Sequence, residues 1–244
     1  MKQGIFRITE NTPLTKNVFR LTLEGDVSAI TAPGQFINIQ LDGLFLRRPI
    51  SVYDISPRAV TVIYKVVGRG TEQLSRMIAG DTLDILTGLG NGYDTVVSGQ
   101  RPLLIGGGVG VPPLYYLAQC LIAEGKHPTV VMGFNTKDEI FAVDDFRAIG
   151  ADVTVATADG SFGVRGFVTD ALPSDYSYVY TCGPEPMLRA VYRSIGTSGQ
   201  FSFEERMGCG FGACMCCSCK TVTGYKRICK DGPVLRKEEI LWEK

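Results

Sequence analysis

The chain has 244 residues, of which 45% are hydrophobic and 20% charged, and its 25 Lys and Arg residues balance its 25 Asp and Glu residues. This length is enough for two modest cores and a small appendage, and the neutral balance favours neither nucleic acid nor an anionic membrane as a partner. The first residues lack the apolar run of a secretion signal and no apolar run is long enough to span a membrane, so we expect a cytoplasmic protein without membrane contact.

Residues 1–98 are predicted to form an antiparallel β-barrel. Apolar and polar residues alternate over 18–23, 36–41 and 60–67, with Gly, Pro and Asp between these runs. Alternation marks strands with one buried face, and short strands with turn signals at close spacing are typical of a small barrel.

Residues 99–200 are predicted to form a doubly wound α/β domain, because strands alternate with helices there. The predicted strands are 102–105, 129–132, 153–156 and 178–181. The predicted helices are 114–124 and segments around 138–149, 166–172 and 184–195. Ligands of such parallel sheets bind at the carboxyl ends of the strands.

Residues 201–244 are predicted to form a third, metal-organised unit. Five of the eight cysteines fall within residues 209–219, and a sixth is Cys229. The segment is too short for a core of its own, so a metal cluster would have to hold it together. In a chain without a secretion signal, cysteines at this density favour metal or redox chemistry over disulfides.

The cysteine spacing is that of plant-type [2Fe–2S] proteins. It runs Cys209-x4-Cys214-x2-Cys217-x11-Cys229. Gly210 and Gly212 let the backbone wrap closely around a cluster. A zinc knuckle is the alternative, although zinc sites usually show two separate C-x2-C pairs. Cys216 and Cys219 also have ligand spacing, so the choice of ligands stays open at this point.

Two segments of the barrel region are candidate phosphate sites. Residues 46–51 (Leu-Arg-Arg-Pro-Ile-Ser) can present a guanidinium to phosphate and a hydroxyl to a ring edge, although a surface arginine on an edge strand would look the same. The segment 63–65 (Ile-Tyr-Lys) adds support. The glycine-rich turn 68–71 precedes a predicted helix at 72–77, where free N–H groups could receive a pyrophosphate.

Two turns of the α/β domain are candidate nucleotide sites. Residues 106–113 (Gly-Gly-Gly-Val-Gly-Val-Pro-Pro) lie between a predicted strand and a helix, but Val111 replaces the third glycine of the dinucleotide motif. Residues 133–135 carry no Arg, which argues mildly against NADP. The turn 182–187 (Cys-Gly-Pro-Glu-Pro-Met) could shape a slot for a nicotinamide ring, and an ordinary tight turn would explain either segment. No catalytic side chain is predicted, since the single histidine, His127, lies before a strand and cofactors would carry the reaction.

Taken in order, these motifs resemble the ferredoxin–NADP reductase superfamily, and more narrowly the electron-transfer subunits of NAD-dependent (class 1B) dihydroorotate dehydrogenases. The resemblance covers essentially the whole chain and includes residues 88–93, 158–163 and 229–234. It implies FAD in the barrel, held by Arg48, Pro49, Ile50, Ser51, Ile63, Tyr64, Lys65, Gly70 and Thr71. It implies NAD along Gly106, Gly107, Gly108, Gly110, Cys182, Gly183 and Pro184, and a [2Fe–2S] cluster on Cys209, Cys214, Cys217 and Cys229.

The resemblance also implies a partner. In the family, an FMN-containing subunit oxidises dihydroorotate, and electrons pass through the cluster and FAD to NAD+ in pyrimidine biosynthesis. A separate subunit is also expected because a dihydroorotate-oxidising barrel needs about 250 residues of its own, and the three predicted units already use this chain. The resemblance implies two copies of each chain. The basic residues Lys220, Lys226, Arg227, Lys230, Arg236 and Lys237 could steer docking or form an ordinary solvated surface. The alternatives are a flavin/iron–sulfur subunit of sulfide dehydrogenase or ferredoxin:NAD(P) reductase type, a stand-alone NADH:acceptor reductase, and a zinc-stabilised nucleotide-binding regulator.

Overall fold

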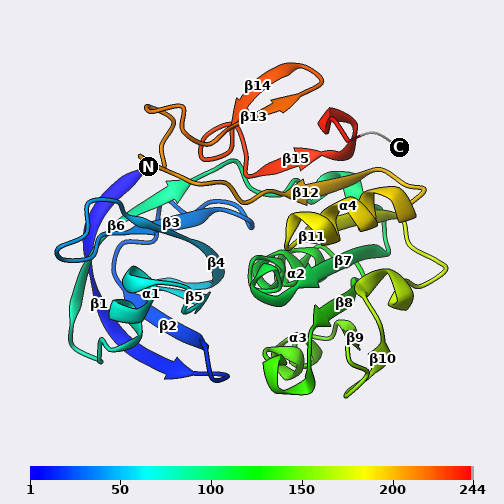
Figure 1. Cartoon of the computed structure of the whole chain (residues 1–244), viewed down its shortest axis with the longest axis horizontal. Helices are drawn as coiled ribbons and strands as arrows, with labels where there is room; N and C mark the ends of the chain where they lie inside the picture. Colours follow the sequence, from blue (N-terminus) through cyan, green and yellow to red (C-terminus); the bar gives the residue numbers. More distant parts are fainter. Residues whose placement is uncertain (243–244) are drawn as a thin grey trace.

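The computed structural model describes residues 1–242 of the chain. Figure 1 shows a barrel built from the first strands, an α/β sheet beside it, and a C-terminal segment that lies across the top of both. None of the helices in the described part of the chain combines the length and the apolar character needed to cross a bilayer.

The N-terminal part is a closed antiparallel barrel of six strands in the order β1-β2-β5-β4-β3-β6, which confirms the predicted barrel. The strands are β1 (Lys2–Pro13), β2 (Val18–Glu24), β3 (Phe36–Ile39), β4 (Arg48–Ser56), β5 (Ala59–Lys65) and β6 (Thr82–Leu89). Leu21 and Leu23 of β2 are fully buried in the barrel interior, as the alternation predicts.

Helix α1 (Arg69–Ser75) begins three residues earlier than the predicted helix at 72–77. The reason is local hydrogen bonding at its start. The Thr71 hydroxyl accepts hydrogen bonds from the N–H groups of Val67 (2.9 Å) and Gly68 (3.3 Å), so it pairs donors just ahead of the helix that would otherwise lack partners. Gly70 and Thr71 therefore lie within the first turn of the helix and not ahead of it.

The second part is a seven-stranded sheet in the order β10-β9-β8-β7-β11-β12-β15, in which all neighbours are parallel except β12 and β15. Its strands are β7 (Pro102–Gly107), β8 (Thr129–Phe134), β9 (Asp152–Thr157), β10 (Val164–Arg165), β11 (Tyr178–Cys182), β12 (Gly199–Ser202) and β15 (Val234–Arg236). Its helices are α2 (Pro113–Ala123), α3 (Val143–Ala148) and α4 (Glu185–Ser194). One face packs against α2 and α3 and the other against α4, so the predicted doubly wound sheet is confirmed.

Two of the predicted helices are wrong in extent or type. The segment around 138–149 forms a 3-10 turn, Lys137–Glu139, and then α3 from Val143, because Ala142 adopts a left-handed conformation (φ 62°) that interrupts the run. The segment 166–172 forms a short 3-10 turn, Val168–Ala171, instead of an α-helix. Asp170 accepts a hydrogen bond from the Phe167 N–H at 2.8 Å at the start of that turn.

The C-terminal part contains a hairpin and a strand that joins the large sheet. The hairpin consists of β13 (Ser218–Thr221) and β14 (Gly224–Arg227), and β15 pairs antiparallel with β12. The predicted boundary between residues 200 and 201 therefore falls inside β12, and the division into three units stays a prediction.

The outer face of β3 carries the C-terminal part. Ile37 and Ile39 belong to the core of the barrel, whereas Phe36 belongs to the same hydrophobic cluster as Cys217, Ile228 and Cys229. All four residues of β3 are buried, because the barrel covers one face of the strand and the C-terminal part covers the other.

The barrel also packs directly against the α/β sheet. The Tyr53 ring of β4 stacks on Tyr115 of α2 with 4.4 Å between centroids. The Tyr53 hydroxyl donates to Asp145 of α3 at 2.5 Å, and Arg20 of β2 forms an ion pair with the same carboxylate. These contacts fix the angle between the two parts.

Candidate functional site

The predicted flavin residues at the start of β4 and in α1 are brought together. A Cβ on Gly70 would lie 2.2 Å from Nε of Arg48, so only glycine lets this guanidinium lie against the helix. Pro49 pairs with Asn38 of β3 in the sheet, which places both side chains on the outer face of the barrel. Arg48, Pro49, Ile50 and Ser51 are all partly exposed. This leaves an accessible cationic side chain of the kind that binds a dinucleotide phosphate.

The predicted segment 63–65 divides between the two faces of the barrel wall. Tyr64 points into the barrel, where its hydroxyl donates to Asn11 Oδ1 at 3.1 Å, and burial raises the pKa of Tyr64 to about 12. Its phenol therefore faces the barrel core and not the surface on which Pro49 lies. Ile63 points outward and packs in the core shared with the α/β sheet, and Lys65 is partly exposed.

The two predicted nucleotide turns form one continuous surface at the middle of the sheet. Cys182 of β11 pairs with Gly106 of β7, and a Cβ on Gly110 would lie 2.3 Å from the Cys182 carbonyl oxygen. A Cβ on Gly107 would lie 2.5 Å from the sulfur of Met187. The chain continues from β7 to β8 on one side and returns through β11 on the other, so this is the switch point where parallel sheets bind ligands.

The Cys182 thiol in this surface is uncharged at neutral pH. Burial raises the pKa of Cys182 to about 12, so the thiol is a small apolar wall and not a nucleophile. Gly183 and Pro184 follow it directly and lead into α4. This geometry suits the positioning of a flat ring.

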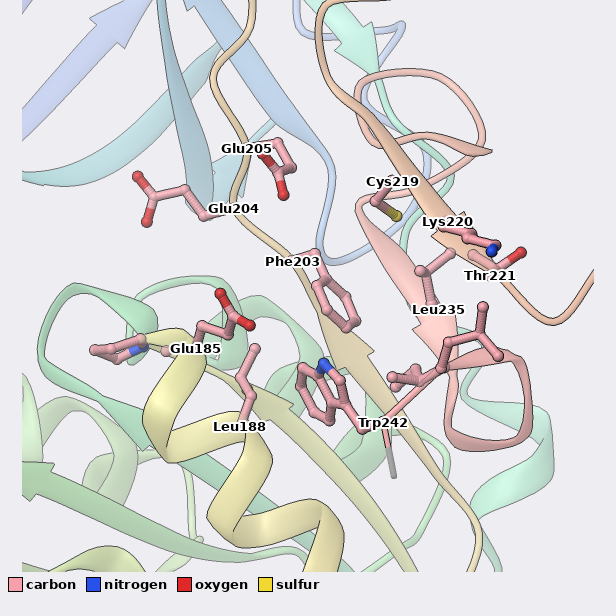
Figure 2. Close-up of a pocket in the computed structure, with 14 residues that line it drawn as sticks. Glu185, Leu188, Phe203, Glu204, Glu205, Cys219, Lys220, Thr221, Leu235 and Trp242 are labelled. Carbon is pink, nitrogen blue, oxygen red and sulfur yellow. The ribbon is translucent and has the colours of Figure 1, made fainter. Parts of the chain in front are cut away.

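A cavity of about 260 Å³ lies between this turn and the C-terminal part. Figure 2 shows the rings of Phe203 and Trp242 between the carboxylates of Glu185, Glu204 and Glu205 on one side and the residues of β13 and β15 on the other. The centroids of these two rings are 5.4 Å apart. Sequence reasoning missed this cavity, since its walls come from segments that only the fold brings together.

The predicted ligand cysteines gather in two pairs. The Cys209 and Cys214 thiols interact, the backbone N–H of Cys209 donates to Cys214 Sγ at 3.4 Å, and the N–H of Cys229 donates to Cys217 Sγ at 3.4 Å. The Cys229 thiol forms a hydrogen bond with the Cys217 thiol and also interacts electrostatically with Cys209. The two pairs therefore lie close to each other. Among residues 1–242, no three metal-binding side chains surround a single-ion position. Two thiol pairs suit a cluster whose two irons each take two thiolates.

Backbone N–H groups of this loop stabilise the thiolate form of Cys209. Burial opposes ionisation of Cys209, but N–H groups of Phe211, Cys214 and Ala213 outweigh it and lower the pKa of Cys209 to about 6. The Ala213 N–H lies 3.2 Å from Cys209 Sγ. N–H···S hydrogen bonds of this kind favour the thiolate that iron requires.

The two surplus cysteines are not members of these two pairs. Cys216 is exposed, and Cys219 lies in β13 at the wall of the cavity, as Figure 2 shows. Burial raises the pKa of Cys219.

Part of the predicted basic cluster is neutralised within the chain. Lys226 pairs with Glu239 at 2.6 Å, and Arg227 pairs with Asp231 at 2.9 Å. Arg236 lies 3.7 Å from Asp94. These three side chains therefore fit an ordinary solvated surface better than a basic patch that steers the docking of a partner.

Comparison with known proteins identifies the relatives of the chain. Residues 204–241 match the family model described as the iron–sulfur cluster binding domain of dihydroorotate dehydrogenase B. The chain is 42% identical to the dihydroorotate dehydrogenase B (NAD(+)) electron transfer subunit of Geobacillus sp. (strain WCH70), over 99% of both chains. It is 40% identical to the subunit of the same name in Fusobacterium nucleatum, over 96% of both.

Solved structures agree with this relationship. The structure of an NADH-dependent reduced ferredoxin-NADP oxidoreductase, studied for flavin-based electron bifurcation, is similar over 98% of this chain and 90% of its own, with a TM-score of 0.89 and 32% identity. A ferredoxin NADP+ reductase from Neisseria gonorrhoeae shares the fold, with a TM-score of 0.69 over 80% of this chain and 90% of its own at 15% identity. The chain therefore belongs to the family of electron transfer subunits of NAD-dependent dihydroorotate dehydrogenase B.

Proposed function

We propose that this chain passes electrons from a dihydroorotate-oxidising partner subunit to NAD+ in pyrimidine biosynthesis. One observation carries the proposal: the segment with the two thiol pairs packs on β3 of the barrel, next to β4 with its flavin motif. The proposed iron–sulfur loop thus lies against β3, the strand beside the proposed flavin strand β4, and the proposed nucleotide turns lie on the neighbouring sheet.

The proposed cofactors are [2Fe–2S], FAD and NAD. When bound, the cluster exchanges single electrons, the flavin exchanges one or two, and NAD accepts a hydride. We assign the cluster to Cys209, Cys214, Cys217 and Cys229, whose paired thiols and N–H donors fit it. Arg48 would hold the FAD phosphates beside Gly70, and the turns 106–110 and 182–184 would orient NAD. We assign the FAD site to residues 1–98, the NAD site to residues 99–200 and the cluster site to residues 201–244.

The partner that we propose is an FMN-containing catalytic subunit, assembled as two copies of each chain in the cytoplasm. A subunit that oxidises dihydroorotate needs about 250 residues for a (β/α)8 barrel. The described residues 1–242 form the six-stranded barrel, the seven-stranded sheet and the C-terminal hairpin, which supports a separate substrate-oxidising subunit.

The test is co-expression with the dihydroorotate-oxidising subunit of the same organism. The purified complex should contain flavin and iron, and it should reduce NAD+ when dihydroorotate is added. Each chain alone should not do so. A complex that forms with both cofactors loaded and still shows no dihydroorotate-dependent NADH formation would refute the proposal.

A second candidate is a subunit of ferredoxin:NAD(P) reductase type. The similarity to the NADH-dependent reduced ferredoxin-NADP oxidoreductase, at 32% identity over 98% of this chain, favours it. Reduced ferredoxin in place of dihydroorotate in the same assay distinguishes the two, because only the second candidate predicts NAD(P)+ reduction without the dihydroorotate-oxidising subunit.

A further inference from the structure

Asn38 is a buried polar residue at the contact between the barrel and the cysteine loop. It lies in β3 with only 1% of its surface exposed. Its side-chain amide donates a hydrogen bond to the Cys209 carbonyl, with 3.3 Å between Nδ2 and the oxygen. Its Oδ1 is buried and has no hydrogen-bond partner within residues 1–242. A buried acceptor without a donor is unfavourable, so a donor brought by a bound group or its water would stabilise it.

The cysteine loop is shaped to meet this side chain. Gly210 follows Cys209 and adopts φ +79°, a conformation that residues with a Cβ rarely take. A Cβ at this position would lie 2.3 Å from Asn38 Nδ2. Glycine is therefore needed both for the turn and for the close approach to Asn38.

On the barrel side, Asn38 is tied to the flavin strand. It lies opposite Pro49 of β4, within the segment that we assign to FAD. Its carbonyl accepts a hydrogen bond from Arg47 at 3.3 Å, and the Arg47 guanidinium also pairs with Asp84 at 3.0 Å. The strand on both sides and the arginine fix the backbone of Asn38, so its side chain is a rigid support for the loop.

We propose that Asn38 is a positioning residue that holds Cys209 at a fixed place relative to the flavin strand and thereby sets the rate of single-electron exchange between cluster and flavin. The inference rests on the proposed function, since it requires both cofactors in this chain. Asn38 holds the carbonyl of Cys209, whose sulfur accepts N–H donors from Ala213 and Cys214. A shift of the loop would change those hydrogen bonds, which help to set the potential and the electronic structure of a cluster.

The test compares Asn38→Leu with Gln40→Leu in the full chain, loaded with FAD and cluster and co-purified with its catalytic subunit. Leu has the same branched arrangement of heavy atoms as Asn but neither of its hydrogen-bonding atoms. Gln40 is the matched control, because it follows β3 and donates to the Leu44 carbonyl at 2.9 Å instead of to the cysteine loop. NADH is mixed with each protein, and flavin bleaching, cluster bleaching, the EPR spectrum and the cluster midpoint potential are recorded.

We expect Asn38→Leu to retain FAD and iron and to reduce its flavin at the wild-type rate. Cluster reduction should be slower than in the wild type, with a changed EPR spectrum and a shifted midpoint potential. Gln40→Leu should match the wild type in all four readouts. An unchanged spectrum, potential and cluster rate in Asn38→Leu would overturn the proposal, as would an equal loss of flavin and cluster reduction.

A second variant covers the case in which Asn38→Leu fails to assemble. Gly210→Ala keeps Asn38 but drives a Cβ against its amide, so it should produce the same selective defect in cluster reduction. Normal cluster reduction in Gly210→Ala would refute the positioning role. A wild-type complex whose cluster NADH cannot reduce at all would instead refute the proposed function.

Discussion

Among single residues, Arg48 depends most clearly on its neighbour, because its guanidinium needs a glycine at position 70. Its guanidinium lies where any residue other than glycine at position 70 would collide with it. We predict that Arg48→Ala weakens FAD retention by about 10- to 100-fold, because one charge-assisted hydrogen bond to phosphate is lost. Equilibrium dialysis of FAD measures this. Arg58→Ala is the control, since Arg58 pairs with Glu24 on the exposed barrel surface, and iron content should be unchanged in both variants.

The cysteine loop gives a matched pair of substitutions. Cys214→Ser should abolish the iron–sulfur absorption and leave bound FAD in place, because the thiol pairs and the flavin motif lie on different segments. Cys216→Ser should retain iron and spectrum, because Cys216 is exposed and outside both pairs. Iron and sulfide analysis checks both results. Loss of the cluster in Cys216→Ser would show that the ligand assignment is wrong.

Tyr64 gives the barrel a predictable sensitivity to alkali. The phenol ionises near pH 10 when unfolded and at about 12 in the folded chain. Between these values the unfolded state binds fewer protons, so the free energy of unfolding falls by up to about 1.4 kcal/mol per pH unit from this residue alone. Tyr64→Phe should lose that part of the slope between about pH 10 and 12, while costing about 1 kcal/mol at neutral pH for the bond to Asn11.

Urea unfolding at a series of pH values measures this slope. Tyr225→Phe is the control, because Tyr225 is 71% exposed and should leave the slope unchanged. Equal slopes in wild type and Tyr64→Phe would contradict the prediction.

At the scale of elements, the segment 88–93 holds the C-terminal part against the barrel. The Asn91 side chain donates to the Val234 carbonyl at 2.8 Å and accepts from the Val234 N–H at 3.2 Å, in the manner of a neighbouring strand. We predict that Asn91→Ala lowers stability by about 1–3 kcal/mol and that iron is released on heating before FAD. Thermal scans at the two cofactor bands test the order of release. Asn17→Ala, on an exposed turn of the barrel, should keep the wild-type order.

The secondary-structure elements also show which parts of the fold can be predicted from the local sequence. Strands such as β2, β7 and β11 could be predicted from alternation or short apolar runs, because each is set by its own neighbours in sequence. The cysteine spacing likewise identifies its chemistry, since three of the four predicted ligands lie on one short loop and the fourth follows at a characteristic distance. Asn38 and Asn91 could not be predicted. Each acts on a segment more than 140 residues away, and a single polar residue in a strand pattern carries no signal of such a partner.

In the whole molecule, Asp145 joins the two large parts. It accepts from the Tyr53 hydroxyl and pairs with Arg20, so one carboxylate of the α/β domain serves two strands of the barrel. We predict that Asp145→Ala speeds hydrogen exchange in β4 and α2 and raises the KM for NAD+ several-fold, because a buried donor and a cation lose their partner at a cost of about 1–3 kcal/mol. Asp144→Ala is the control, as Asp144 is 97% exposed. Unchanged exchange in β4 and α2 would contradict the prediction.

The antiparallel strand β15 has a consequence for any attempt to divide this protein. It covers the open side of β12, and without it the backbone N–H and C=O groups of Gln200, Phe201 and Ser202 would be free to pair with another molecule. A chain shortened before residue 203 would thus keep the predicted flavin and nucleotide segments but expose an unpaired sheet edge. We therefore expect removal of the C-terminal part to cost solubility as well as the cysteine loop.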